Sequence, residues 1–314
     1  MILILTEKYD PSSQNVISKL ESKNANYKVI YGLDLLEKPF NIDINKQQIF
    51  FKNELLENIN IVWYRRWLNY QYVFSENLKE NDYLKTEFET LSSYLMLTIQ
   101  TKKWLNIPPF INPYPSKAHQ LKKAKECGLK IPNTNVTNKK NFLKKFYNEN
   151  KDNIISKNLN NPYVLHENNE IHCTYTTKIE KKDIKNQENL FFPSIFQSNI
   201  NKDVELRIFY FLRKFYSSAI FSSHNQQTNV DFRVYDYNRP NRIMKFELPE
   251  FIKLKLIDFM ESFNLHTGSI DIMKDKGDNF YFLEVNPQGQ FGGMSDYGLN
   301  IENDIADYLI ENDF

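Results

Sequence analysis

The sequence predicts an α/β protein that becomes α+β in its later part, and three observations support this prediction. Residues 1–31 place an apolar run (1–5), a helical spacing of apolar residues (12–22) and an alternating run (27–31) in the order of a βαβ unit. From residue 191 onward strand patterns dominate, and a proline-rich stretch at 107–115 separates the two parts. With 314 residues, 41% of them hydrophobic, the chain can form several domains with real cores.

The middle of the chain carries clear start and stop signals. A strand at 60–63 leads into the stretch WYRRW at 63–67, and apolar spacing predicts a long helix over 82–105. Ser116 is a suitable N-cap for a further helix that Gly128 ends, followed by a helix at 139–149 and a strand at 153–157. We place the domain boundaries to give an N-terminal α/β domain (1–112), a central subdomain (113–197) and a C-terminal domain (198–314).

The C-terminal part reads as strands at 194–197, 205–212, 215–222 and 243–247, then a helix that Pro249 opens and that runs to Phe263. Two strands follow at 269–273 and 280–285. Gly277 in the turn between them predicts an antiparallel hairpin.

Composition excludes several classes of protein. Forty Lys and Arg against 39 Asp and Glu leave a formal net charge of +1, which points to neither nucleic acid nor an anionic membrane as a partner. Cys127 and Cys173 lie far apart without a CxxC motif, which argues against a disulfide framework and fits a reducing compartment. No run is long enough for a signal peptide or a membrane span, so we expect a cytoplasmic protein.

The predicted hairpin carries three oxygen donors. Asp271 lies on its first strand, while Glu284 and Asn286 share one face of the second, because strand side chains alternate with period two. Oxygen ligands without His or Cys suit Mg²⁺ or Mn²⁺ with phosphate oxygens in the shell. Solvated surface carboxylates are the alternative, although an unpaired charge inside these apolar runs is costly. Four of the eight glycines (Gly289, Gly292, Gly293, Gly298) follow directly and allow the backbone to turn there.

The stretches DIM and LEVNP resemble the metal-binding end of the ATP-grasp superfamily. In sequence order, FPSIFQ, VELRIFYF, VDFR and FLEVNPQGQF, together with WYRRW, are similar to the graspetide or microviridin type of ATP-grasp peptide maturase, including grasp-with-spasm maturases. The similarity covers nearly the whole chain and thins between about residues 33 and 60. It implies an ATP-grasp fold with an N-terminal α/β pre-ATP-grasp domain, a small central subdomain and a C-terminal antiparallel-sheet domain, with the nucleotide between the last two.

The resemblance also implies roles for single residues. Lys117 and Lys157 match the two lysines that hold the nucleotide phosphates, and Glu205 matches the acceptor for the ribose hydroxyls. The hinge that contacts adenine and ribose matches 196–200, with Gln197, Ser198 and Ile200 as nucleotide contacts, and Asp271, Glu284 and Asn286 match the Mg²⁺ ligands. The segment between Lys157 and Thr176 departs from the glycine-rich phosphate flap of many ATP-grasp enzymes, because it contains no glycine.

The implied reaction activates a carboxylate with ATP. An Asp or Glu side chain of a ribosomally made precursor peptide, with leader and core, receives the γ-phosphoryl group and then joins a Ser or Thr hydroxyl or a Lys amine, giving ester or amide crosslinks. Arg207 and Arg233 can present guanidinium groups to the phosphate, or each can be a surface partner of an acid. Arg65, Arg66 and Trp67 are candidates for a peptide-docking surface, unless WYRRW is a strand end whose arginines extend to solvent.

Two other functions stay open at this point. One is an ATP-grasp ligase that adds a free amino acid to a protein or a small carboxylate, and the other is a non-catalytic nucleotide- or peptide-binding module. The joint presence of Lys117, Lys157, Asp271, Glu284 and Asn286 speaks against the latter. The family resemblance further implies a homodimer in the bacterial cytoplasm. Separately, we interpret His224 as an ordinary loop histidine.

Overall fold

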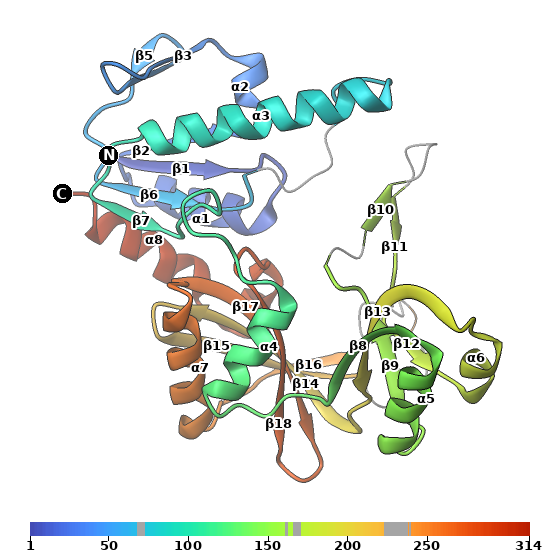
Figure 1. Ribbon diagram of the computed structural model, residues 1–314. Helices are drawn as coiled ribbons and strands as arrows, with labels where there is room; N and C mark the ends of the chain where they lie inside the picture. Colours follow the sequence, from blue (N-terminus) through green and yellow to red (C-terminus); the bar gives the residue numbers. More distant parts are fainter. Residues whose placement is uncertain (68–72, 161–162, 166–170, 223–237, 239) are drawn as a thin grey trace. The chain divides into compact units, whose positions relative to one another are not determined.

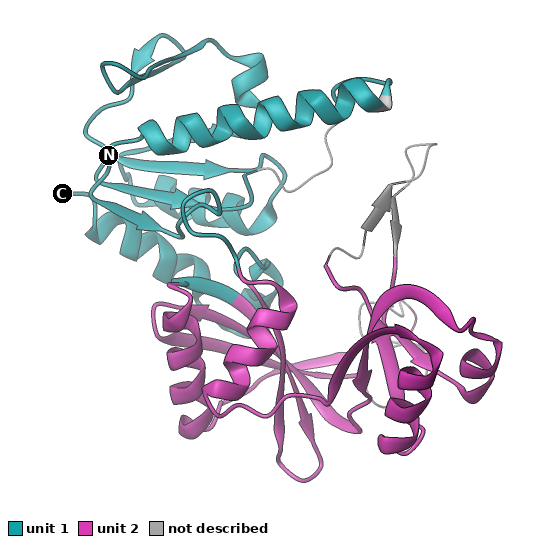
Figure 2. Ribbon diagram, viewed as in Figure 1, with its two compact units in different colours: residues 1–114, 265–268, 287–314 teal, residues 115–264, 269–286 magenta. Residues whose placement is uncertain are grey.

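The computed structural model describes the chain except for residues 68–72, 161–162, 166–170, 223–237 and 239 (Figure 1). The described residues form two compact units (Figure 2): unit 1 holds residues 1–114, 265–268 and 287–314, and unit 2 holds 115–264 and 269–286. The C-terminal residues therefore group with the N-terminal third of the chain. The three-domain division stays a prediction.

Unit 1 is built on a parallel sheet of four strands in the order β2 (Tyr27–Tyr31), β1 (Ile2–Thr6), β6 (Ile61–Tyr64) and β7 (Lys103–Leu105). Strand β1 is buried on both faces, which explains why its sequence is an unbroken apolar run and not an alternating one. Helices α1 (Pro11–Ser22) and α8 (Ile301–Glu311) lie side by side on one face, and α3 (Leu78–Thr98) covers the other (Figure 1). The core of unit 1 is thus two-sided, as the βαβ prediction requires.

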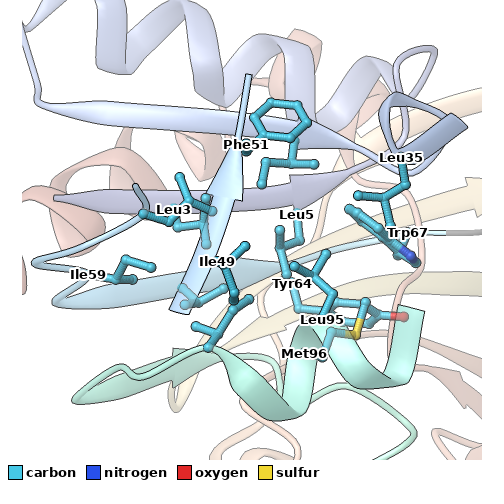
Figure 3. Packing of buried hydrophobic residues seen from close by; sticks show 14 of the residues in the cluster. Leu3, Leu5, Leu35, Ile49, Phe51, Ile59, Tyr64, Trp67, Leu95 and Met96 are labelled. Carbon is cyan, nitrogen blue, oxygen red and sulfur yellow. The ribbon is translucent and has the colours of Figure 1, made fainter. Parts of the chain in front are cut away.

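The core under α3 joins helix, parallel sheet and a small antiparallel sheet. Leu3 and Leu5 of β1 pack with Leu95 and Met96 of α3, and Ile49 of β4 completes the cluster (Figure 3). The small sheet has the order β3 (Phe40–Asp43), β4 (Gln48–Phe51) and β5 (Glu54–Leu55), and the short helix α2 (Asp34–Glu37) precedes it. The sequence did not predict these strands, because they are short and lack a clear alternation.

The helix predicted over 82–105 was too long at its C-terminal end. It stops at Thr98, where Ile99 adopts extended backbone angles, and Lys103–Leu105 forms strand β7 beside β6. A strand of three residues is too short to be recognised from its sequence pattern, since its stability comes from pairing with a strand far away in the sequence. Helix α8 and the 3₁₀ helix Gly292–Tyr297 were also not predicted.

Unit 2 contains two larger sheets. The first has the order β12 (Thr177–Ile179), β9 (Ile154–Lys157), β13 (Leu190–Ser198) and β8 (Thr134–Lys139), and helices α5 (Lys140–Glu149) and α6 (Lys181–Asn186) accompany it. The second has the order β16 (Arg242–Lys245), β15 (Lys214–Phe221), β14 (Lys202–Phe211), β17 (Thr267–Asp275) and β18 (Phe280–Asn286), with helices α4 (Lys117–Glu126) and α7 (Glu250–Ser262). A separate pair joins β10 (Tyr163–Leu165) and β11 (Ile171–Cys173).

Several predictions for this part of the chain are confirmed. The Ser116 hydroxyl accepts a hydrogen bond from the backbone N–H of His119 and caps α4, and Gly128 has a φ of +77° just after the helix ends. Strands β17 and β18 pair antiparallel, as the hairpin prediction requires. Over the described residues, every helix is too short or too polar to cross a membrane.

Candidate functional site

A pocket in unit 2 collects most of the residues that the sequence singled out. Its walls come from both sheets of the unit and from the start of α4. Nine of the predicted site residues line it: Lys117, Lys157, Gln197, Ser198, Ile200, Glu205, Arg207, Asp271 and Glu284.

The hairpin β17–β18 places two acids directly opposite each other. Asp271 pairs in register with Glu284, and Ser269 pairs with Asn286. The register shifts just beyond Asp271, where Leu283 is the extra residue, and such bulges redirect side chains beside functional sites. Asp271 and Glu284 both line the pocket. Asn286 is exposed and lies two residues further along the Glu284 face of the strand.

Lys117 supplies positive charge next to the hairpin. It is the first residue of α4, and its ammonium Nζ lies 3.1 Å from Glu284 Oε2 and 3.4 Å from the carbonyl oxygen of Asn158. The two side chains are 23% and 31% exposed, so the pair is open to solvent and contributes at most about 1 kcal/mol to stability. A pair this exposed can exchange partners when a ligand enters.

Gln120 fixes α4 against the hairpin, and the sequence interpretation missed it. Its buried side chain accepts a hydrogen bond from the N–H of Val285 at 2.9 Å and donates one to the carbonyl of the same residue at 3.0 Å. Because Val285 stands between Glu284 and Asn286, this contact sets the position of Lys117 relative to the acids. A glutamine on the apolar face of a predicted helix, beside Leu121 and Ala124, is the sequence signal that could have revealed it.

Two further basic residues reach the pocket from different strands. Lys157 ends β9 and Arg207 lies in the middle of β14. Glu205 and Arg207 share one face of β14, because they are two residues apart on a strand. The pocket therefore combines three basic and three acidic side chains of described residues: Lys117, Lys157, Arg207, Glu205, Asp271 and Glu284.

The end of β13 and the residues that follow it, 197–200, form one wall of the pocket, and polar contacts hold this wall in place. Gln197 is buried, and its Nε2 donates to the hydroxyl of Thr134 at 2.9 Å. The Ser198 hydroxyl accepts a hydrogen bond from the backbone N–H of Asn133 at 3.0 Å. With its side chains used for these contacts, this wall offers a fixed backbone to a ligand.

Two hydrogen bonds hold the Glu205 side chain in the pocket. Its Oε1 accepts hydrogen bonds from Lys202 Nζ and from the Ser222 hydroxyl, each at 2.6 Å. Lys202 and Ser222 are both buried. The sequence interpretation named neither of them, although a lysine that opens a mostly apolar strand is unusual enough to mark a buried ion pair.

The candidates for peptide docking lie elsewhere, in unit 1. Arg65 is 1% exposed, and its guanidinium donates to Asp10 Oδ2 at 2.6 Å and to the carbonyl of Gly289 at 3.1 Å. It also lies over the Phe291 ring, 4.7 Å from the centroid. Trp67 is fully buried. The expectation that Arg65 and Trp67 form an exposed docking surface is therefore wrong, because both side chains are enclosed by unit 1.

Arg66 belongs to the same region of unit 1. Its backbone N–H donates to the side-chain oxygen of Gln288 at 3.1 Å, and the amide nitrogen of Gln288 donates to the Tyr114 hydroxyl at 3.0 Å. Burial raises the pKa of Tyr114 to about 12, which keeps this phenol neutral. Arg233 and His224 lie outside the described residues.

The hairpin donors fit a magnesium ion that shares its shell with phosphate. Among the described residues, no three His, Cys, Asp or Glu side chains gather into a metal cluster. Asp271 and Glu284, with the nearby amide of Asn286, form an oxygen-only set. Mg²⁺ is usually bound through one or two carboxylates plus substrate phosphates and waters, not by an all-protein cage, so this small set is suitable.

Comparison with known proteins places this geometry in a wider group. No protein-family model and no curated protein matches the sequence. Among solved structures, the macrocyclase MdnC from Microcystis aeruginosa, bound with its precursor peptide MdnA, is 26% identical with a TM-score of 0.83 over 99% of each chain. A RiPP-associated ATP-grasp ligase from Chryseobacterium gregarium, in complex with ADP and a leader and core peptide, is 24% identical with a TM-score of 0.86 over 99% of this chain and 96% of that one.

The ATP-grasp ligase PsnB, complexed with a precursor variant, Mg and ADP, is 18% identical with a TM-score of 0.81, and covers 100% of this chain and 98% of its own. The parallel sheet of unit 1 and the antiparallel sheets of unit 2 are thus those of the ATP-grasp fold, as the sequence predicted. The chain is therefore similar, over 99% of its residues, to the macrocyclase MdnC and to the RiPP-associated ATP-grasp ligase from Chryseobacterium gregarium.

Proposed function

We propose that the protein is an ATP-dependent macrocyclase that crosslinks a ribosomally made precursor peptide. The observation that carries the proposal is the match to MdnC over the full chain, together with a pocket that gathers the acids, lysines and hinge segment expected of a nucleotide site. ATP and Mg²⁺ are the proposed cofactors, with Mn²⁺ as a possible substitute metal. The ADP-bound and Mg-bound relatives motivate this choice.

Each pocket residue has a physical task in this proposal. Lys117 and Lys157 hold the phosphates by charge, and the backbone of 197–200 with Gln197, Ser198 and Ile200 borders the adenine and ribose. Asp271, Glu284 and Asn286 hold Mg²⁺, which when bound offsets phosphate charge as the phosphoryl group moves. When phosphate and metal enter, Lys117 can exchange Glu284 for a phosphate, since that pair is partly exposed to solvent.

We assign the phosphate or acyl phosphate to Arg207 as its partner, and its position in the lining of the pocket supports this assignment. A guanidinium offers two parallel donors to phosphate oxygens, and the position of Arg207 beside Glu205 on β14 brings it to the pocket. The γ-phosphoryl group passes to a peptide Asp or Glu carboxylate. A Ser or Thr hydroxyl or a Lys amine then attacks the acyl carbon and expels phosphate. Each crosslink consumes one ATP and removes one water from the peptide. Arg233 is proposed for the same task on the family resemblance alone.

The proposal also concerns partners and setting. We infer that the precursor peptide binds through its leader, that the enzyme works in the bacterial cytoplasm and that it forms a homodimer. Arg66 is the one remaining candidate of the three predicted docking residues. Its side chain is 14% exposed, so its contribution to docking is expected to be small.

The experiment is co-expression with the short peptide encoded next to the gene, followed by mass spectrometry. The expected result is a mass decrease of one water for each crosslink, with ADP as the product in a reconstituted reaction. A precursor of unchanged mass under conditions of ATP turnover would contradict the proposal. ADP release that requires a free amino acid would instead support a ligase that adds amino acids.

A further inference from the structure

The pair Lys202–Glu205 is unusual because it is a buried ion pair whose acid lines the pocket. The side chain of Lys202 is 3% exposed, and its Nζ lies 2.6 Å from Glu205 Oε1. Ser222, which is fully buried and directly follows β15, donates to the same oxygen at 2.6 Å. Two donors therefore converge on one atom of the carboxylate.

A buried ion pair of this kind is weak as a device for stability. Removing two charges from water costs several kcal/mol for each ion, and an apolar pair of similar volume is often equally stable or better. Lys202 begins a strand whose other buried residues, such as Val204 and Leu206, are apolar. A methionine would fill the same volume at lower cost, so the charge at position 202 is better explained by the geometry it imposes on Glu205.

In that geometry one carboxylate oxygen of Glu205 is held by protein donors, and the other can accept hydrogen bonds from a ligand. Both hydrogen bonds that the described residues donate to this side chain end on Oε1, and Glu205 lines the pocket next to the 197–200 segment. A carboxylate is an acceptor only, so its second oxygen, Oε2, is suited to hydroxyl groups of a ligand. With Oε1 locked by two donors, rotation of the carboxylate is restricted and Oε2 has a defined direction.

We infer that Lys202 and Ser222 are positioning residues that orient Glu205 toward the sugar hydroxyls of the nucleotide, and that they thereby make the enzyme select ribonucleotides over deoxyribonucleotides. The inference rests on the proposed function, since it takes ATP as the ligand of the pocket. A site built to accept a hydroxyl proton rejects an analogue that lacks the hydroxyl, because the buried acceptor is then left without its partner. Loosening the acceptor should weaken that rejection.

The test compares the KM of ATP with that of deoxy-ATP lacking the 2′-hydroxyl, for the full enzyme with its precursor. The unmodified enzyme should prefer ATP. Ser222→Ala should reduce the KM of deoxy-ATP divided by the KM of ATP by about three- to ten-fold. The change should come mainly from a higher KM for ATP, with kcat nearly unchanged. Lys202→Met should reduce the ratio further.

Ser217→Ala is the matched control, because Ser217 is also a buried serine, but it lies on β15 opposite Ile208 and not opposite Glu205. It should leave the ratio unchanged. The inference is overturned if Ser222→Ala changes both KM values equally, or if the unmodified enzyme uses both nucleotides equally well. Failure of the unmodified enzyme to bind either nucleotide would overturn the proposed function together with this inference. If Lys202→Met does not fold, Ser222→Ala still decides the outcome.

Discussion

In unit 1 the carboxyl ends of β1 and β6 face a segment of the same chain, whereas in unit 2 the acids of β14, β17 and β18 border an open pocket. Ligands of open parallel sheets bind where connections leave a strand in opposite directions, and β1, flanked by β2 and β6, is such a place. There Asp10, which follows β1, and Arg65, which follows β6, are bound to each other, and Arg65 also donates to the carbonyl of Gly289. Residues 288–292 thus cover the β1–β6 part of this edge, while a second pocket, lined by residues 7–9, 31–34 and 37, lies on its β2 side.

The difference shows which charged groups are structural. Arg65 and Asp10 are 1% and 0% exposed and pair within unit 1, while Lys117 and Glu284 are 23% and 31% exposed beside a pocket. A satisfied buried pair has no capacity left for a ligand, and a solvated pair does. In the sequence, the hairpin acids were candidates for a metal site and WYRRW was a candidate for peptide docking, and both combine charges with apolar neighbours. Burial separates them.

The largest expected effect on stability comes from removing the buried ion pair between Asp10 and Arg65 in unit 1. Arg65→Leu removes the buried cation 2.6 Å from the Asp10 carboxylate and leaves only the more distant Arg66 at 3.6 Å, so the free energy of unfolding should fall by about 3–5 kcal/mol. The three tryptophans, Trp63, Trp67 and Trp104, all belong to unit 1, and their fluorescence in a urea titration reports this unit. The double variant Asp10→Leu with Arg65→Leu should lose less. Equal losses for the single and double variants would show that the pair is not a unit.

A substitution in the pocket of unit 2 should have the opposite effect, because it should lower activity and leave stability unchanged. Glu284→Gln removes one carboxylate charge from the proposed metal site, and kcat should fall by at least about 100-fold while the tryptophan unfolding curve stays in place. Glu247→Gln, which changes an acid that is 78% exposed and paired with Lys253, is the control and should keep full activity. A fully active Glu284→Gln variant would exclude Glu284 as an essential metal ligand.

A smaller effect tests how the segment 288–292 is held. The Ser12 hydroxyl accepts hydrogen bonds from the N–H groups of Phe291 and Gly292 at 3.2 and 3.1 Å. Ser12→Ala leaves both without this acceptor and should cost about 1–3 kcal/mol of unfolding free energy. Ser18→Ala, on the exposed face of the same helix, should cost less than about 0.5 kcal/mol. Equal values for both variants would mean that Ser12 does not secure the segment.

The smallest effect is a pH dependence. Burial lowers the pKa of His266, partly opposed by a hydrogen bond with the backbone of Trp104. Because the unfolded chain then binds the proton more readily, unit 1 should lose stability as pH falls below the ordinary histidine value of about 6.5. His266→Gln should flatten this part of the pH profile of tryptophan-monitored unfolding, and His119→Gln, in unit 2, should not. An unchanged profile in His266→Gln would assign the effect to other groups.

Much of this arrangement was predictable from local signals, and the exceptions share a cause. Ser116, Gly128 and the Gly277 turn act within a few residues of themselves, so α4 and the β17–β18 hairpin could be located from the sequence. Strand alternation put Glu284 and Asn286 on one face of the hairpin, whereas the register that sets Asp271 opposite Glu284 includes a bulge at Leu283 that was not predicted. The family resemblance, and not periodicity, led to the nucleotide residues of the pocket.

What the sequence did not reveal depends on partners far away in the chain. Strand β7 exists through pairing with β6, and Arg65 is structural because Asp10 and Gly289 meet it. Gln120 acts through the backbone of Val285, 165 residues away. Lys202 is close to Glu205 in sequence, but only the burial of both, with Ser222, shows what it does. Contacts at such separation leave no trace in a local pattern.

The most direct test of the comparison is photolabelling with an azido-ATP probe in the presence of Mg²⁺, followed by peptide mapping. If ATP binds in the pocket of unit 2, the labels should lie on peptides that contain the 197–200 segment or the neighbouring pocket strands. Unlabelled ATP should compete with this labelling. Competed labels in unit 1, on peptides around residues 7–37 or the 288–292 segment, would contradict it.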